Sequence, residues 1–221
     1  MYGSEISLNT FLTPKKLTKI LEKFQCELQT KIPPYSLTRL TKLVRSRLTT
    51  LEQVGISFTG GEPLHQFPFA RELAQRLANC NYILHLETNA TIADFAEDCA
   101  SMFNTCSADV KERTARASVD WKLLAKTELK FIERFIEAGN PNIFAKVVIT
   151  NETLADDIWW IAERIEPLEV DLVIQPVTPI RTSIQAPSLQ RLEDLEQKLL
   201  PLLGDHLWFN IQMHKLSLAL R

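Results

Sequence analysis

The sequence predicts an α/β fold in which short parallel strands alternate with amphipathic helices. Short apolar runs rich in β-branched residues recur from residue 56 onward, and longer segments with apolar residues at helical spacing lie between them. Polar residues follow directly where most of the apolar runs end. Strand–helix repetition of this kind is typical of parallel βαβ units. An open sheet and a barrel both fit the pattern.

Two helices are predicted ahead of the first strand. Thr13 caps the first helix, Pro14 occupies its first position, and apolar residues continue at helical spacing to Phe24. The second helix begins at Ser36 and its apolar face ends near residues 49–50. We therefore expect a helical segment over residues 1–53, followed by strand–helix repeats over residues 54–221 in a single domain.

Six strands and five intervening helices are expected in the repeats. The strands are Ile56–Thr59, Tyr82–Thr88, Cys106–Val110, Phe144–Thr150, Leu172–Val177 and Leu207–Gln212. The helices are 67–79, 92–102, 121–138, 152–166 and 188–203. A chain of 221 residues is long enough to bury a sizeable core in this way.

The composition points away from several classes of protein. A net charge of −2 gives no electrostatic footprint for nucleic acid or an anionic membrane. No apolar run approaches the roughly 18 residues of a membrane-spanning helix. The four cysteines are scattered without a C-x-x-C pair, which indicates neither a disulfide framework nor a metal knuckle. We expect free thiols and a cytoplasmic protein without nucleic-acid or membrane partners.

The segment Gly55–Leu64, GISFTGGEPL, ends a predicted strand with two glycines, a carboxylate and a proline. Glycines allow the backbone to lie directly against a ligand, and Pro63 restricts both its own φ angle and the conformation of Glu62. A carboxylate presented in this fixed direction suits an ammonium group or a metal ion. Taken alone, the same residues also fit a tight turn with a solvated glutamate.

The other predicted strands also close with polar residues. These closing segments are Glu87-Thr88-Asn89, Ser107-Ala108-Asp109-Val110-Lys111, Thr150-Asn151-Glu152, Gln175-Pro176-Val177-Thr178 and Gln212-Met213-His214-Lys215. The carboxyl ends of parallel strands face the ligand in open sheets and in barrels alike. We therefore expect the binding site at this edge of the sheet.

The ordered series TGGEPL, LETNAT, SADVK, KVVITNET, VIQPVTP and IQMHKL resembles the radical S-adenosylmethionine superfamily. Within that superfamily it is most similar to the 7-carboxy-7-deazaguanine synthases, over about residues 54 to 216. The resemblance implies a partial (β/α)6 barrel that binds S-adenosylmethionine across its strand ends. It also implies a [4Fe-4S] cluster as a family cofactor, and it leaves room for Mg²⁺.

The resemblance implies cofactor-binding roles for eight residues: Gly60, Gly61, Glu62, Thr88, Asn89, Ser107, Lys111 and Gln175. The two glycines and Glu62 would hold the methionyl amino group, and Thr88 and Asn89 would line the next strand end. Ser107 and Lys111 would contact the carboxylate or ribose side of the cofactor. Gln175 and the loop after it would approach the adenine or the substrate.

The resemblance also implies a reaction, the radical ring contraction of 6-carboxy-tetrahydropterin to a 7-deazapurine that feeds queuosine- or archaeosine-type tRNA modification. Glu87, His214 and Lys215 would bind this pterin-like substrate. The radical chemistry belongs to the cofactor, and the protein supplies position and excludes water.

One family element is missing from the sequence. Enzymes of the superfamily carry a Cys-x3-Cys-x2-Cys loop after the first strand, whose thiolates hold the cluster. Only Cys26 precedes the Gly-Gly motif here, and MYGSEISLNTFLTPKKL resembles the segment that follows the cluster loop. We expect a barrel without its first strand and a chain that is inactive on its own. Either Met1 is a false or truncated start of a full enzyme, or the segment was lost and a non-catalytic S-adenosylmethionine- or partner-binding protein remains.

Further features leave alternatives open. Without a first strand, the strand at Ile56 would present an unpaired edge, which a second copy, the early helices or a partner chain would cover. His85 and Glu87 alternate onto one face of a strand, and His65 closely follows the Gly-Gly motif, so the three could be the ligands of a hydrolytic metal site. Ala90 stands where the family often has glycine, a minor change if the backbone needs no positive φ angle there.

Two short motifs have both a structural and a functional interpretation. Trp159-Trp160 suggests stacking on nucleic-acid bases, although on a helix we expect one core anchor and one half-exposed ring. Residues 150–153, Thr-Asn-Glu-Thr, contain an N-x-T triplet that we expect to serve as a helix cap.

Overall fold

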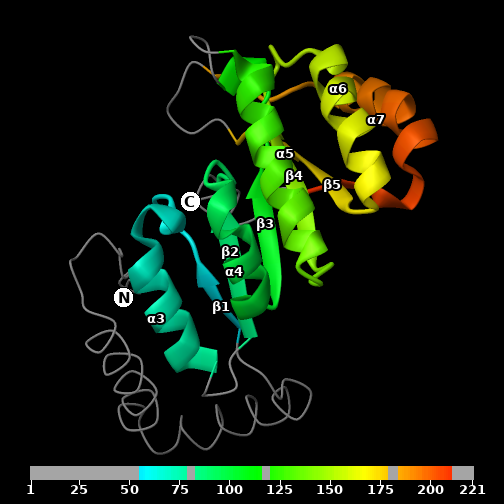
Figure 1. The fold of residues 1–221 in the computed structure, drawn as a ribbon. Helices are drawn as coiled ribbons and strands as arrows, with labels where there is room; N and C mark the ends of the chain where they lie inside the picture. Colours follow the sequence, from blue (N-terminus) through cyan, green and yellow to red (C-terminus); the bar gives the residue numbers. More distant parts are fainter. Residues whose placement is uncertain (1–54, 79–82, 116–119, 179–183, 211–221) are drawn as a thin grey trace, which may run out of the picture. The chain divides into compact units, whose positions relative to one another are not determined.

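The computed structural model describes residues 55–78, 83–115, 120–178 and 184–210 (Figure 1). The chain divides into two compact units, Met1–His85 and Leu86–Arg221, and each is described by itself. The two helices predicted at 13–24 and 36–48 lie outside the described residues, as does the predicted boundary between residues 53 and 54. These remain predictions.

Six parallel strands form a sheet that does not close, which confirms the predicted α/β class. The strands are β1 (Gly55–Phe58), β2 (Ile83–Thr88), β3 (Thr105–Asp109), β4 (Ile143–Ile149), β5 (Asp171–Pro176) and β6 (Leu207–Phe209). Their order in the sheet follows their order in the sequence. In the second unit, Cys106 lies opposite Ile143, Phe144 opposite Asp171, and Leu172 opposite Leu207.

Five α-helices of the described residues alternate with the strands. They are α3 (Phe67–Ala78), α4 (Ala96–Met102), α5 (Trp121–Glu137), α6 (Ala155–Ile165) and α7 (Leu189–Leu203). Short 3₁₀ turns join them to the strands: η1 (Pro63–Gln66), η2 (Ala93–Phe95), η3 (Arg113–Ala115), η4 (Glu166–Leu168) and η5 (Gly204–His206). The helix predicted over 92–102 is therefore divided into η2 and α4.

Helix α6 begins three residues later than predicted. Its N-cap is Leu154, which makes no side-chain capping hydrogen bond, so the cap expected within residues 150–153 is wrong. The reason is a competing use of the Thr153 hydroxyl, which accepts a hydrogen bond from the Thr150 N–H at 2.9 Å. Side chains of this kind often bond to nearby backbone groups in place of a helix.

The core of the second unit lies between the sheet and its helices. Alternate residues of β3, β4 and β5 are fully buried on one face: Cys106, Ala108, Ala145, Val147, Leu172 and Ile174. Helices α5 and α6 contribute buried apolar side chains such as Phe131, Phe135 and Ile161. Helix α5 lies against β3 and β4 (Figure 1). Successive strand residues point to opposite faces, so the other face of these strands is free to carry functional groups.

No helix among the described residues is both long enough and apolar enough to cross a membrane.

Candidate cofactor site

The Gly-Gly motif of the first unit follows β1 and leads into η1. Gly60 has a φ angle of +118°, a conformation that side chains rarely adopt, so the turn requires glycine there. A Cβ atom built on Gly60 or Gly61 meets no atom of the described residues within 4 Å. Glu62 is extended, and its Oε1 accepts a hydrogen bond from the Leu64 N–H at 3.1 Å. The motif thus places the half-buried Glu62 carboxylate next to two glycines whose Cβ positions face open space.

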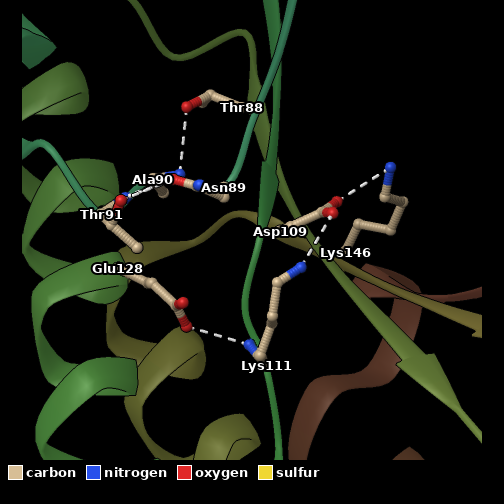
Figure 2. Close-up of polar contacts among 8 residues, drawn as sticks. All are labelled: Thr88, Asn89, Ala90, Thr91, Asp109, Lys111, Glu128 and Lys146. Carbon is tan, nitrogen blue, oxygen red and sulfur yellow. Dashed lines mark hydrogen bonds and ion pairs between the residues drawn. The ribbon is translucent and has the colours of Figure 1, made fainter. Parts of the chain in front are cut away.

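The end of β2 is a turn held by the side chains of Thr88 and Asn89 (Figure 2). The buried Thr88 hydroxyl accepts a hydrogen bond from the Ala90 N–H at 3.1 Å. Asn89 Oδ1 accepts hydrogen bonds from the Thr91 N–H at 3.0 Å and the Thr91 hydroxyl at 2.6 Å. Both predicted residues therefore shape the strand end through their side-chain oxygens.

Ala90 adopts a φ angle of +55° in this turn and is fully buried. The backbone at this position therefore does need a positive φ angle, so alanine in place of the glycine that the family often has is not a minor change. A left-handed conformation crowds Cβ against the backbone and costs roughly 1–2 kcal/mol for residues other than glycine. The turn tolerates alanine because the Thr88 hydroxyl and the surrounding packing hold it.

Replacing Ala90 tests this conformation directly. We expect Ala90→Gly to change the free energy of unfolding by less than about 1 kcal/mol, because relief of strain offsets the added freedom of the unfolded chain. We expect Ala90→Val to lower it by about 3 kcal/mol through strain and overpacking. Urea denaturation would measure both. The same Ala→Val exchange at exposed Ala138 is the control, and an equal effect at the two sites would refute the explanation.

The end of β3 carries a cluster of two lysines and one aspartate, Asp109, Lys111 and Lys146 (Figure 2). Lys146 lies opposite Asp109 in the parallel register, and its Nζ is 2.9 Å from Asp109 Oδ1. Lys111 Nζ is 3.5 Å from Asp109 Oδ2. Each ammonium group has three N–H donors, and the two share a single carboxylate here. The lysine–aspartate cluster can therefore still bind an anionic group.

Ser107 lies two residues before Asp109 and on the same face of β3. Its side chain is buried at 2% exposure, and its Oγ atom has no hydrogen-bond partner among the described residues. Buried polar atoms in native proteins are nearly always paired, so an unpaired one calls for a specific explanation. A bound ligand on this face would supply the missing partner.

Two buried glutamates fix the backbone behind the cluster. Glu128 of α5 is fully buried and accepts a hydrogen bond from the Lys111 N–H at 2.9 Å (Figure 2). Glu112 is 1% exposed and accepts hydrogen bonds from the Thr114 N–H at 2.7 Å, from the Thr114 hydroxyl, and from the Thr153 hydroxyl at 3.1 Å. Glu112 thereby joins the loop after β3 to the loop after β4.

A cleft of about 540 Å³ lies at the carboxyl end of β4, between α6 and α7. Its lining combines apolar side chains such as Ile158 and Leu195 with polar ones such as Asn151 and Arg191. Lys198 at its rim pairs with Asp156, and this hydrogen bond and positive charge hold the pKa of Asp156 below its ordinary value. None of the nine predicted cofactor or substrate residues that the structure describes lines this cleft.

Comparison with known proteins gives the relatives of the chain. It is 36% identical over 137 residues to the 7-carboxy-7-deazaguanine synthase of Thermococcus kodakarensis, covering 62% of this chain and 53% of that protein. It is 34% identical over 173 residues to the enzyme of the same name from Methanocaldococcus jannaschii, covering 76% of this chain and 69% of that protein. The chain belongs to the 7-carboxy-7-deazaguanine synthase family. No family model matches it.

Solved structures support the fold of this family member. A radical S-adenosylmethionine methyltransferase from Sphaerobacter thermophilus superposes with a TM-score of 0.58 at 14% identity, covering 91% of this chain and 57% of that one. Streptococcus suis SuiB bound to S-adenosylmethionine gives a TM-score of 0.54 at 16% identity, covering 72% and 39%. At such low identity the likeness shows the fold alone. The chain spans between about half and two thirds of the length of the two synthases named above.

Of the four remaining predicted residues, two lie on described strands and two lie outside the described residues. Gln175 is buried on β5 opposite Val148, and Glu87 is half-buried on β2. His214 and Lys215 lie outside the described residues. The structure brings Ser107 and Lys111 together with Asp109 and Lys146, which the sequence interpretation did not assign.

The missed residues left some signal in the sequence. Lys146 is the one charged residue of β4, IFAKVVI, and such a position in a predicted buried strand points to function or pairing. Glu128 falls among the apolar positions that α5 turns toward the core, near Phe131 and Ile132. Glu112 directly follows the predicted strand-end motif, and nothing in the local sequence pattern indicates that it is buried.

The residues present do not fit the cluster expected of the family. The 221 residues contain no Cys-x3-Cys-x2-Cys sequence. The side chains of Cys99 and Cys106 are buried and form no disulfide. The part of the chain that the structure describes, which includes His65, His85 and Glu87, has no group of three His, Cys, Asp or Glu residues that could hold a metal ion.

Trp159 and Trp160 are both half-buried on α6. The Trp160 ring meets Trp121 edge-on with 5.2 Å between ring centroids, and the Arg164 guanidinium lies 3.7 Å from the Trp160 ring centroid. Neither ring is the expected core anchor, since both are half-buried, but protein groups occupy the Trp160 ring that base stacking would need.

Proposed function

We propose that the chain binds S-adenosylmethionine at the carboxyl ends of its strands. Three findings support this proposal: the family is that of 7-carboxy-7-deazaguanine synthases, the fold is shared with radical S-adenosylmethionine enzymes, and the SuiB structure contains this cofactor. Ligands of α/β folds bind outside the carboxyl ends of the strands. The observation that carries the proposal is the unpaired, buried Ser107 hydroxyl beside the lysine–aspartate cluster.

The chemical groups of the cofactor match the residues that the family pattern assigns to them. The methionyl ammonium is a cation, and Glu62 with Gly60 and Gly61 supplies a carboxylate and open backbone. The methionyl carboxylate and the ribose hydroxyls need donors, which Lys111 and Ser107 supply. Thr88, Asn89 and Gln175 complete the proposed set.

The catalytic part of the proposal concerns the complete family enzyme. We propose a pterin-like carboxylated substrate, bound by Glu87, His214 and Lys215, that is converted by radical ring contraction to the product for which the relatives are named. These 221 residues lack the three thiolates of the family cluster, so we assign no step through a cluster and expect the chain alone to be inactive. The second candidate function is binding of S-adenosylmethionine or a partner without catalysis.

Two measurements separate these functions. If residues upstream of Met1 in the coding sequence include an in-frame cysteine triplet, the full-length protein should form 7-carboxy-7-deazaguanine after anaerobic iron–sulfide reconstitution. If the full-length protein binds S-adenosylmethionine but forms no product, the non-catalytic function holds. Mg²⁺ is an optional addition to the same assay.

Replacing Ser107 by alanine is expected to affect stability and binding in opposite directions. Removing an unpaired buried hydroxyl should raise the free energy of unfolding by about 1 kcal/mol. Removing a donor to the cofactor should weaken S-adenosylmethionine binding about fivefold to tenfold. Calorimetric titration and urea denaturation measure the two effects. Ser101→Ala, on an exposed face of α4, should change neither, and unchanged affinity in Ser107→Ala would count against the proposal.

A further inference from the structure

One row of side chains crosses the sheet of the second unit on the face opposite its buried core. The parallel registers place Asp109 opposite Lys146, Lys146 opposite Val173, and Val173 opposite Trp208. Residues directly opposite one another on neighbouring strands share a face. Leu172 and Ile174, which flank Val173, are fully buried on the other face. Trp208 therefore lies on the face that carries the lysine–aspartate cluster.

Trp208 is the one tryptophan whose ring contacts no aromatic ring and no cationic side chain of the described residues. Trp121 and Trp160 contact one another, and Lys198 approaches the Trp159 ring at 5.9 Å. The Trp208 side chain has no hydrogen bond, ring contact or cation contact to another described residue. It is 55% exposed. An indole is a large flat apolar surface, and it is enriched where ligands and partners bind.

The surroundings of Trp208 favour a flat ligand. Val173, its neighbour on β5, is small and half-buried, and Phe144 and Val148 on the same face of β4 are also half-buried. Neighbouring strands lie about 4.8 Å apart, so the backbones at Trp208 and Lys146 are separated by roughly 10 Å. Across this distance the face changes from aromatic through aliphatic to cationic. A fused planar heterocycle that carries an anionic group matches this order.

We propose that the Trp208 indole stacks on the planar heterocycle of the reaction's product, and on the pyrimidine ring that a pterin-like substrate shares with it, and that it selects for fused-ring ligands. The inference rests on the proposed function, because the name of the relatives supplies a ligand of this description: 7-carboxy-7-deazaguanine is planar and carries a carboxylate. Stacking of a base on an aromatic side chain is strong and tolerant of ring substituents. The two lysines of the lysine–aspartate cluster, at the other end of this row, attract the anionic ligand to this face.

Titration of the chain with 7-carboxy-7-deazaguanine tests the inference without any need for activity. We expect the ligand to quench tryptophan emission and Trp208→Ala to weaken its binding about tenfold or more. Trp208→Phe should keep the affinity within about threefold while most of the quenching disappears. Trp159→Phe on α6 is the matched control, and it should keep both the affinity and the quenching. The phenylalanine variant decides the question if the alanine variant folds poorly.

Three results would overturn the inference: no binding of 7-carboxy-7-deazaguanine by the parent chain, unchanged affinity in Trp208→Ala, or undiminished quenching in Trp208→Phe. Titrating the same variants with S-adenosylmethionine keeps this outcome distinct from the proposed function. We expect Trp208→Ala to bind S-adenosylmethionine as the parent does. A variant that loses S-adenosylmethionine but keeps 7-carboxy-7-deazaguanine would assign Trp208 to the cofactor and overturn the inference. A parent chain that binds only 7-carboxy-7-deazaguanine would refute the cofactor proposal instead.

Discussion

Replacing Glu112 by alanine is expected to lower the free energy of unfolding by about 3 kcal/mol and the Tm by about 6–12 °C. The Glu112 carboxylate is buried and accepts three hydrogen bonds, from the Thr114 N–H, the Thr114 hydroxyl and the Thr153 hydroxyl. Its removal leaves the buried Thr153 hydroxyl and the two half-buried Thr114 donors without this acceptor, and it disconnects the loops after β3 and β4. Differential scanning calorimetry and urea denaturation measure the loss.

Two variants test whether the loss comes from this network. Thr153→Val removes one of the three hydrogen bonds to Glu112 and should cost about 1–2 kcal/mol. Glu193→Ala removes an exposed carboxylate from α7 and should change stability by less than about 0.5 kcal/mol. If Glu112→Ala were no more destabilising than Glu193→Ala, Glu112 would not join the two loops in solution.

Replacing Glu62 by glutamine is expected to weaken S-adenosylmethionine binding about 10- to 100-fold, because a hydrogen bond to a charged group contributes roughly 1.5–3 kcal/mol. The amide oxygen of glutamine can still accept the hydrogen bond from the Leu64 N–H, so the turn into η1 should persist. The exchange therefore removes the negative charge and keeps the shape. Calorimetric titration of parent and variant gives the ratio of Kd values.

Glu137→Gln is the matched control for charge, since Glu137 is an exposed residue at the end of α5. Its S-adenosylmethionine affinity should equal that of the parent. Salt provides a second check, because a charge-dependent contact weakens as ionic strength rises. Equal affinities for Glu62→Gln and the parent would remove Glu62 from the cofactor site and leave it a purely structural role in capping η1.

The sequence was sufficient to predict the elements whose periodicity is strong. The predicted strand Phe144–Thr150 differs by one residue at each end from β4, and the predicted helix 121–138 differs by one residue from α5. The strand is an apolar run interrupted by Lys146 alone, and the helix has apolar residues at helical spacing. The strand-end motif of β3 was likewise predicted, and Ser107 and Lys111 lie there with Asp109 and Lys146.

The remaining features depend on groups that are distant in sequence. The hydrogen bond from Thr153 to Glu112 joins residues 41 positions apart, and no local pattern reveals it. The use of Thr153 in this bond also explains why α6 starts later than its capping triplet suggested. Ala90 is similar, because its left-handed backbone depends on the Thr88 hydroxyl and on burial. Alanine itself gives no signal of positive φ.

A crystal structure of the chain grown with S-adenosylmethionine is the most direct test of the central claim, which is that the strand ends of this family member bind the cofactor. The account predicts that a cofactor oxygen lies within hydrogen-bond distance of the Ser107 hydroxyl, with the Lys111 ammonium beside it. Cofactor bound instead in the cleft between α6 and α7, or crystals in which the Ser107 hydroxyl faces no ligand at saturating S-adenosylmethionine, would contradict it.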